Sequence, residues 1–341
     1  MGEQLTPPDD GEAAAANGPP LGLGGFVPVL LALAGFVTAF AVLRFGNDGF
    51  VTDFGALGCA ADAARPPAPF TGTSQYRLWV LLICAQTALW FALSAPLLAS
   101  LLAKGTRARL LAPGVWLKMA ALLLFLAWVS RLPVAYQRPF EGMAGLHPWH
   151  VYKMSFFGFV GGVVAVLAIV GLWATQAALK EAEGGPAREP GGGVRDFLAL
   201  RSTLELYLFA AGVIIGAATL ATGALRQAVT AACPPAEKQF MVQDVLGYGL
   251  AFSLLLALVY APAHAQLART RSALREALVP LPESAPAPGA KFWNDWNSER
   301  RAVTELLHAN AGLFASLAGA LSILTPLLGS LVSMLLGGEG E

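Results

Sequence analysis

Long stretches without a charged residue constrain this chain more than any other feature of its sequence. Six gaps between consecutive Asp, Glu, Lys or Arg residues hold 31, 26, 26, 20, 24 and 33 residues in chain order. A helix of about 20 mostly apolar residues is long enough to cross the hydrocarbon core of a bilayer. We therefore expect an all-α fold, a polytopic bundle of transmembrane helices.

Composition excludes the other broad classes of protein. Charged residues make up 13% of the chain and apolar residues 56%, whereas a soluble domain carries about 25% charge. Disorder requires low hydrophobicity and high net charge, but 22 basic residues here balance 22 acidic ones. Because the net charge is zero, the chain lacks the basic footprint of a nucleic-acid-binding protein. We expect membrane lipids, and no nucleic acid, among its partners.

The charge-free stretches predict six spans and a seventh apolar segment. The third span is included although it contains Lys118, because the rest of it is apolar up to the terminal Arg131. The seventh segment, 311–337, is long enough to span, but Pro326 equally allows a kinked, re-entrant helix. The six expected spans are 22–44, 78–103, 110–132, 154–178, 205–226 and 245–267.

The distribution of basic residues predicts the orientation. Lys and Arg favour the cytoplasmic side of a membrane, and 14 of the 22 fall on one predicted side, chiefly in 104–109, 180–201 and the connector after the sixth span. We therefore place the N-terminus in the cytoplasm, in a plasma (inner) membrane. The preference for Arg over Lys and the many alanines favour a bacterial source. The expected organisation is a disordered cytoplasmic leader (1–20), a six-span domain (21–267), a cytoplasmic connector (268–309), a C-terminal apolar helix (310–338) and an acidic tail (339–341).

The connector shows the pattern of an amphipathic helix. Trp293, Trp296, Val303 and Leu307 are spaced as one face of a helix with charged residues around it. Such a helix fits the inner membrane surface, where Trp293 and Trp296 would act as interfacial anchors. With about 40 residues the connector is too short for a catalytic domain, but it offers a contact surface for a cytosolic protein partner.

No residue pattern points to catalysis, a cofactor or a metal. The P-loop, G-x-S-x-G, H-E-x-x-H and C-x-x-C motifs are absent from the sequence, so we expect a protein that is not an enzyme. His147 and His150, with Glu141 nearby, lack further zinc ligands and favour an interfacial loop. Lys118 is the one charge well inside a predicted span. Either its stem reaches the headgroups or it lies on an ion path.

Small residues at four-residue spacing mark helix faces that allow close packing. The pairs Gly158/Gly162 and Gly212/Gly216 predict packing within the chain or, alternatively, an interface in a homo-oligomer. A stripe of small and polar residues in the last segment either packs against another helix or lines a wet path. Its members include Ser316, Gly319, Ser322, Gly329 and Ser333.

The three cysteines lie in two different predicted environments, one inside a span and two in external loops. Cys84 lies inside the second span and is expected to be a buried thiol. Cys59 and Cys233 fall in the first and third external loops, where a disulfide is chemically allowed. Sequence spacing does not reveal whether they are within bonding distance, so a bridge and two free thiols both stay open.

Three functions remain from these patterns. The leading one is a self-associating channel or a pore-forming or gating protein, because of the polar stripe in the last segment. The alternative is a non-conducting membrane sensor or scaffold that binds a cytosolic partner through 268–309. The third is a small-solute transporter with a site near Lys118.

Overall fold

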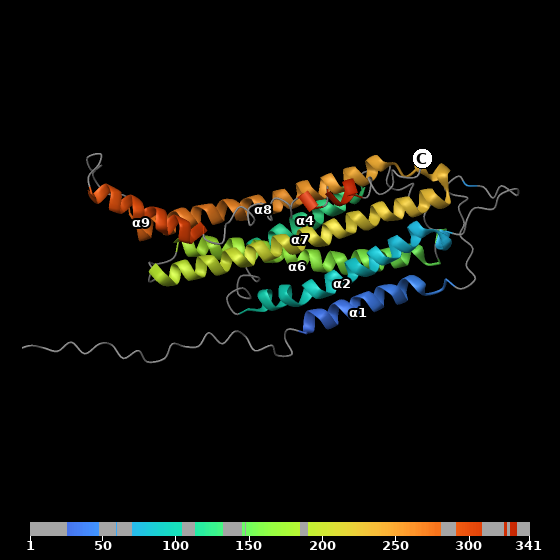
Figure 1. The fold of residues 1–341 in the computed structure, drawn as a ribbon, viewed down its shortest axis with the longest axis horizontal. Coiled ribbons are helices and arrows are strands. Elements are labelled where there is room, and N and C mark those ends of the chain that lie inside the picture. The colour runs from blue at the N-terminus through green and yellow to red at the C-terminus, as the bar shows by residue number, and fades with distance from the viewer. Residues whose placement is uncertain are drawn as a thin grey trace, which may run out of the picture.

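The computed structural model describes residues 26–47, 59, 70–103, 113–131, 145–146, 148–184, 190–280, 291–308, 324–325 and 328–332. Within these ranges the chain is α-helical and contains no strand, which confirms that the fold is all-α. The long helices lie side by side along the longest axis (Figure 1). They are α1 (Val27–Arg44), α2 (Ser74–Leu102), α4 (Pro113–Arg131), α6 (His150–Gly184), α7 (Pro190–Ala232), α8 (Val242–Leu278) and α9 (Lys291–His308), with short 3-10 helices η3 (Phe70–Gly72) and η4 (Pro234–Lys238).

Five of the described helices are long and apolar enough to cross a membrane, namely α1, α2, α6, α7 and α8. Among the described residues the structure thus supports five spans, fewer than the six to seven expected. The third expected span is a helix, α4, but Lys118 and Arg131 leave only 12 uncharged residues between them. That length is about 18 Å of helix, short of the ~30 Å hydrocarbon core. Most of 311–337 lies outside the described residues.

The expected loop between the fourth and fifth spans is largely helical. α6 continues to Gly184 through residues 180–183, Lys-Glu-Ala-Glu, which favour helix. α7 begins at Pro190, a residue that the first turn of a helix tolerates. α7 has 43 residues and α8 has 37, or about 65 and 55 Å of helix. Both helices are therefore longer than the ~30 Å hydrocarbon core.

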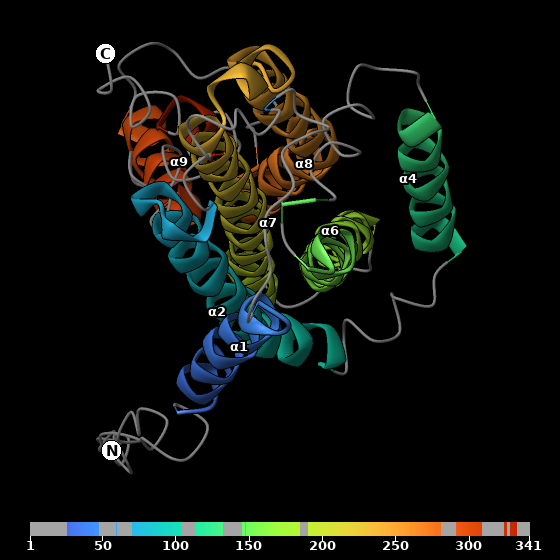
Figure 2. The ribbon, with the colours of Figure 1, turned by 90° about the vertical axis from the view of Figure 1, so that its right-hand side faces the viewer.

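α7 is the central helix of the bundle. Of its apolar stretch 67% is buried inside the protein, against 17–39% for the other four long helices. In Figure 2, seen along the bundle, α2, α6 and α8 surround α7, α1 packs on α2, and α4 stands at the edge beside α6. The fully buried side chains of α7, such as Leu204 and Tyr207, face these neighbours.

Glycines allow the helices to approach closely at two of these contacts. A Cβ added to Gly161 of α6 would lie 2.7 Å from the Trp90 ring of α2, and one added to Gly171 would clash with the Tyr207 ring of α7. Large aromatic rings thus occupy the space that the missing side chains leave, which holds α2, α6 and α7 together.

The helix ends gather at two opposite ends of the bundle. The C-terminal ends of α1 and α7 lie with the N-terminal ends of α2, α6 and α8 at what we call the disulfide end (Figure 1). The C-terminal ends of α6 and α8 lie with the N-terminal end of α7 and with α9 at what we call the α9 end. Candidate functional residues gather at both.

Candidate functional site

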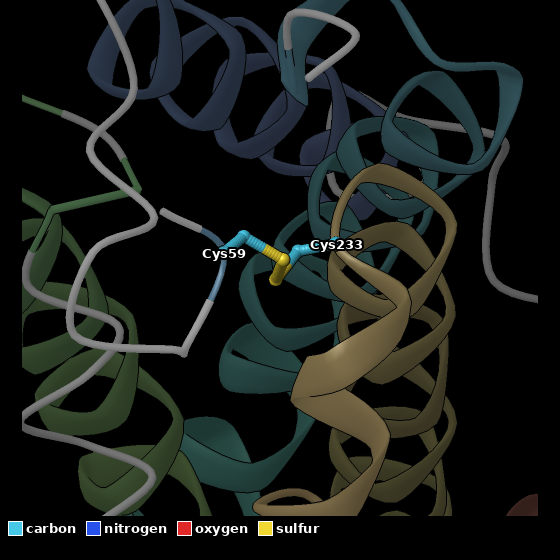
Figure 3. Close-up of a disulfide and its surroundings, with 2 residues drawn as sticks. All are labelled: Cys59 and Cys233. Carbon is cyan, nitrogen blue, oxygen red and sulfur yellow. A yellow bond between two sulfur atoms is a disulfide. The ribbon is translucent and has the colours of Figure 1, made fainter. Parts of the chain in front are cut away.

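A disulfide joins two distant parts of the chain at the first of these ends. Cys59 and Cys233 are 174 residues apart in sequence, and their Cα atoms are 6.0 Å apart. Figure 3 shows the bond beside the C-terminal end of α7. Of the two outcomes that the sequence left open, the structure has the bridge, and it ties the segment after α1 to α7. Cys84 is a free, buried thiol on α2.

A buried lysine reinforces the same end. Lys153 of α6 is only 4% exposed, and its Nζ donates hydrogen bonds to the Leu43 carbonyl at 3.1 Å and the Phe45 carbonyl at 2.7 Å. A third bond, at 3.3 Å, goes to Asn47 Oδ1. The ammonium group thereby satisfies carbonyls that the end of α1 leaves without helical partners. In the sequence this residue is only a basic residue at the edge of a span.

Aromatic rings fill the space behind the lysine. Ring centroids are 5.0 Å apart for Phe70 and Tyr76, 5.7 Å for Tyr76 and Trp79, and 6.3 Å for Trp79 and His150. Trp79 is 1% exposed, so it packs inside the protein. His150 is also buried, at 4% exposed, while His147 and Glu141 lie outside the described residues.

At the opposite end, α9 folds back onto the end of α8. Trp296 Nε1 donates to the Pro280 carbonyl at 2.9 Å, and Arg300 donates to the Val279 carbonyl and to Glu276 Oε2 at 3.2 and 2.9 Å. The Arg300 guanidinium also lies 4.9 Å from the centre of the Trp296 ring. The side of α9 that carries Trp296, Val303 and Leu307 therefore packs on protein, with Leu307 only 1% exposed. Trp293 stacks on Trp296.

A buried arginine attaches the other end of α9 to α7. Arg201 is 6% exposed; its Nε donates to Glu205 Oε1 at 2.9 Å and its Nη1 to the Leu307 carbonyl at 3.3 Å. Sequence reasoning placed Arg201 in a loop and missed this role. A signal was present, since Arg201 and Glu205 are four residues apart, as a helical ion pair requires.

α6 and α8 are also in register at this end. Thr270 Oγ1 donates to the Leu179 carbonyl at 3.2 Å, and Gln266 Nε2 donates to Glu183 Oε2. These bonds place the polar ends of the two helices at the same level. Lys118 of α4 is close to α6 in space, because its Nζ donates to Gln176 Oε1 at 2.7 Å, in an exposed position.

The predicted close-packing glycines divide into two groups. Gly216 and Gly329 meet, since a Cβ added to Gly329 would lie 2.8 Å from the Gly216 carbonyl oxygen, and Thr325 occupies the space above Gly216. Gly212 is buried in α7. Gly158 and Gly162 are exposed, and a Cβ at either would have no atom within 4 Å among the described residues.

The C-terminal stripe is described only in part. Ser330 is 1% exposed and its Oγ donates to the Val245 carbonyl of α8 at 3.0 Å. With Gly329 against α7, this segment packs between α7 and α8. Ser316, Gly319, Ser322 and Ser333 lie outside the described residues.

Comparison with known proteins does not assign the chain to a family. No family model, no curated protein and no solved structure matches this chain. The several long apolar helices are compatible with a membrane protein, and its function has to be argued from the two ends of the bundle.

Proposed function

We propose that this chain is a multi-pass membrane protein that works as a non-conducting sensor or scaffold and binds a cytosolic protein through its α9 end. The observation that carries the proposal is the unbroken course of α7. Cys233, in the disulfide, directly follows its last residue, and Arg201, near its start, holds the Leu307 carbonyl of α9. A single rigid helix is the kind of element that couples two distant sites.

Orientation is part of this proposal. The positive-inside distribution puts the α9 end in the cytoplasm and the disulfide end outside, where disulfides persist. Reporter fusions after Arg275 are expected to report cytoplasm, and fusions within 232–238 the outside. The reverse result would remove the cytosolic partner from the proposal.

Hydrogen–deuterium exchange on the reconstituted protein tests the coupling. Reduction of the disulfide is expected to raise amide exchange in α9 as well as at Cys233, because both contact α7. The matched control is a Cys59→Ser, Cys233→Ser variant, in which the same reductant should change nothing. If reduction alters exchange at the disulfide end and leaves α9 unchanged, the two ends are independent and the sensor proposal fails.

The channel hypothesis becomes the second candidate, and one observation favours its self-association. Gly158 and Gly162 leave an open face on α6, which suits the close approach of a helix from a second copy. The described part of the C-terminal stripe, by contrast, packs against α7 and α8, which favours packing over a wet path.

Two measurements separate the candidates. Gly158→Leu with Gly162→Leu is expected to reduce the mass of the particle in detergent if the face is an interface, while Gly114→Leu, at another open glycine on α4, leaves it unchanged. Ion flux into liposomes above that of empty vesicles would favour the channel; the sensor proposal expects none.

A further inference from the structure

Three aromatic side chains are exposed at the disulfide end, in contrast to the buried rings beside them. Phe45, Trp149 and Tyr152 are 70%, 63% and 70% exposed. The rings of Trp149 and Tyr152 are 5.7 Å apart, and a Cβ added to Gly46, next to Phe45, would lie 3.7 Å from Trp149 Cδ1. The end of α1 and the start of α6 thus form one small apolar surface, which we call the aromatic surface.

The backbone of Trp149 is unfavourable for a bulky residue. Its φ is 61°, and among the described residues it is the one non-glycine residue with a positive φ. Its carbonyl accepts from Lys153 N at 2.9 Å, so this residue starts α6, and His150, which follows it, is buried. Packing inside the protein does not account for an aromatic side chain here, because the Trp149 side chain is mostly exposed. Backbone strain of this kind clusters at functional sites.

The aromatic surface lies where the apolar parts of α1 and α6 stop. The charge-free stretch of α1 ends at Arg44 and that of α6 begins after Lys153. The bonds from Lys153 Nζ to the Leu43 and Phe45 carbonyls hold these two helix ends at one level. In a membrane protein this level corresponds to the boundary of the hydrocarbon core, where the acyl chains meet the headgroups.

An exposed apolar stripe on α6 continues from the aromatic surface along the spanning part of the helix. Phe156, Phe159 and Val163 follow Tyr152 at four, seven and eleven residues, a spacing that puts them on one face of the helix. All three are exposed. Exposed apolar side chains on a spanning helix suit contact with lipid, so a bilayer that covers this stripe also reaches Tyr152 and Trp149.

Tryptophan and tyrosine combine an apolar ring with a polar N–H or O–H group, and membrane proteins concentrate them at the level of the headgroups. We infer that Phe45, Trp149 and Tyr152 bind the headgroup region of the phospholipid bilayer and fix the depth of the disulfide end. Three partly exposed side chains offer less area than the roughly 800 Å² that each partner gives to a stable protein interface, which favours lipid over protein. The inference does not depend on the sensor proposal, since a channel would use the same anchor.

Fluorescence quenching of the full chain in phosphatidylcholine vesicles tests the inference. The signal of the wild type minus that of Trp149→Phe isolates the Trp149 indole. Bromine atoms on the acyl chains near the headgroups are expected to quench this difference at least about twofold more than bromine atoms near the bilayer centre, and aqueous acrylamide should quench it weakly. Trp79→Phe is the matched control, because the buried Trp79 indole at the same end should respond little to all three quenchers.

Three results would overturn the inference. Strong quenching by acrylamide without an effect of bromine would place the indole in water, open to a soluble ligand. Stronger quenching by the deep bromine atoms would place it inside the hydrocarbon core. Protection from every quencher would show that protein covers the indole, and loss of that protection at a lower ratio of protein to lipid would identify the cover as a second copy.

Trp149→Asn gives a second, independent measurement and replaces Trp149→Phe if that variant does not fold. Asn adopts a left-handed backbone more readily than an aromatic residue, so this change relieves the strain while it removes the anchor. We expect amide exchange at the start of α6 to rise several-fold in vesicles. Exchange that stays the same or slows would show that the ring has no role in the membrane and that only the backbone strain was lost.

Discussion

The two ends of the bundle hold their helices together by different means. The disulfide end uses a covalent bond, a lysine that is 4% exposed and a run of buried aromatic rings. The α9 end also has a buried charge, Arg201, but among the described residues it has no cross-link, and its arginines pair with carboxylates that are 42% and 44% exposed. Exposed ion pairs stabilise little, whereas a cross-link and a buried, satisfied charge stabilise much more. The contacts at the α9 end are therefore the weaker of the two sets, which is what the proposed partner binding at that end requires.

Among the substitutions at the two ends, removal of the disulfide should lower the free energy of unfolding the most. Cys59→Ser with Cys233→Ser opens a loop of 174 residues, and cross-links that close long loops contribute about 3–5 kcal/mol. Urea or thermal unfolding of the purified protein measures the loss, and non-reducing gel mobility checks that the wild type carries the bridge. A wild type with two free external thiols in native membranes would contradict the structure.

Replacement of the buried lysine should cause the next largest loss of unfolding free energy. Lys153→Met keeps the length of the side chain, leaves the Phe45 carbonyl without its donor and leaves the Leu43 carbonyl with Asn47 Nδ2 alone, at a cost of about 2–3 kcal/mol. We expect faster amide exchange at the end of α1. Lys180→Met, at an exposed position of the same helix, is the control and should leave the unfolding free energy nearly unchanged.

At the α9 end, the contact of Arg201 with α9 tests whether the contacts there are weaker than those at the disulfide end. Arg201→Gln removes the donor to the Leu307 carbonyl, and we expect the α9 contact to weaken by about 1–2 kcal/mol with faster exchange in α9 alone. Arg195→Gln, exposed and two turns earlier in α7, should behave as the wild type. A global loss of stability as large as that of the disulfide variant would contradict the difference between the ends.

The smallest effect is expected for the ion pair between α8 and α9. Glu276→Gln breaks a pair whose side chains are 16% and 44% exposed, and such pairs are worth below about 1 kcal/mol. Only the local exchange rate of α9 should rise, and high salt should reduce the difference from the wild type because salt screens exposed charges.

Much of the fold could be predicted from the sequence, and less of the site. α6, α7 and α8 each cover an expected span, and α2 covers all but the last residue of one. A long apolar stretch favours the membrane whatever its neighbours are, so such spans can be predicted from the local sequence. The third expected span is a helix, α4, but its uncharged stretch between Lys118 and Arg131 is shorter than those of the five spanning helices. The helical stretches on either side of 185–189 were missed because charge was equated with loop, although Ala, Leu, Glu and Lys also favour helix.

The amphipathic stripe of α9 illustrates what sequence pattern alone leaves undecided. Trp293, Trp296, Val303 and Leu307 predict a helix with one apolar face, and the helix is present. A membrane surface and a protein surface both accept such a face. The hydrogen bond of Trp296 to Pro280 and the burial of Leu307 place it on α8 and α7.

The sequence by itself determined that this chain is helical and where its apolar lengths begin and end, because these properties depend on residues adjacent in the chain. Only the tertiary structure decided that Cys59 meets Cys233, that Lys153 binds the end of α1 and that Arg201 holds α9. Each of these contacts joins residues more than 100 positions apart. Their distance depends on how whole helices pack, and no local pattern encodes it.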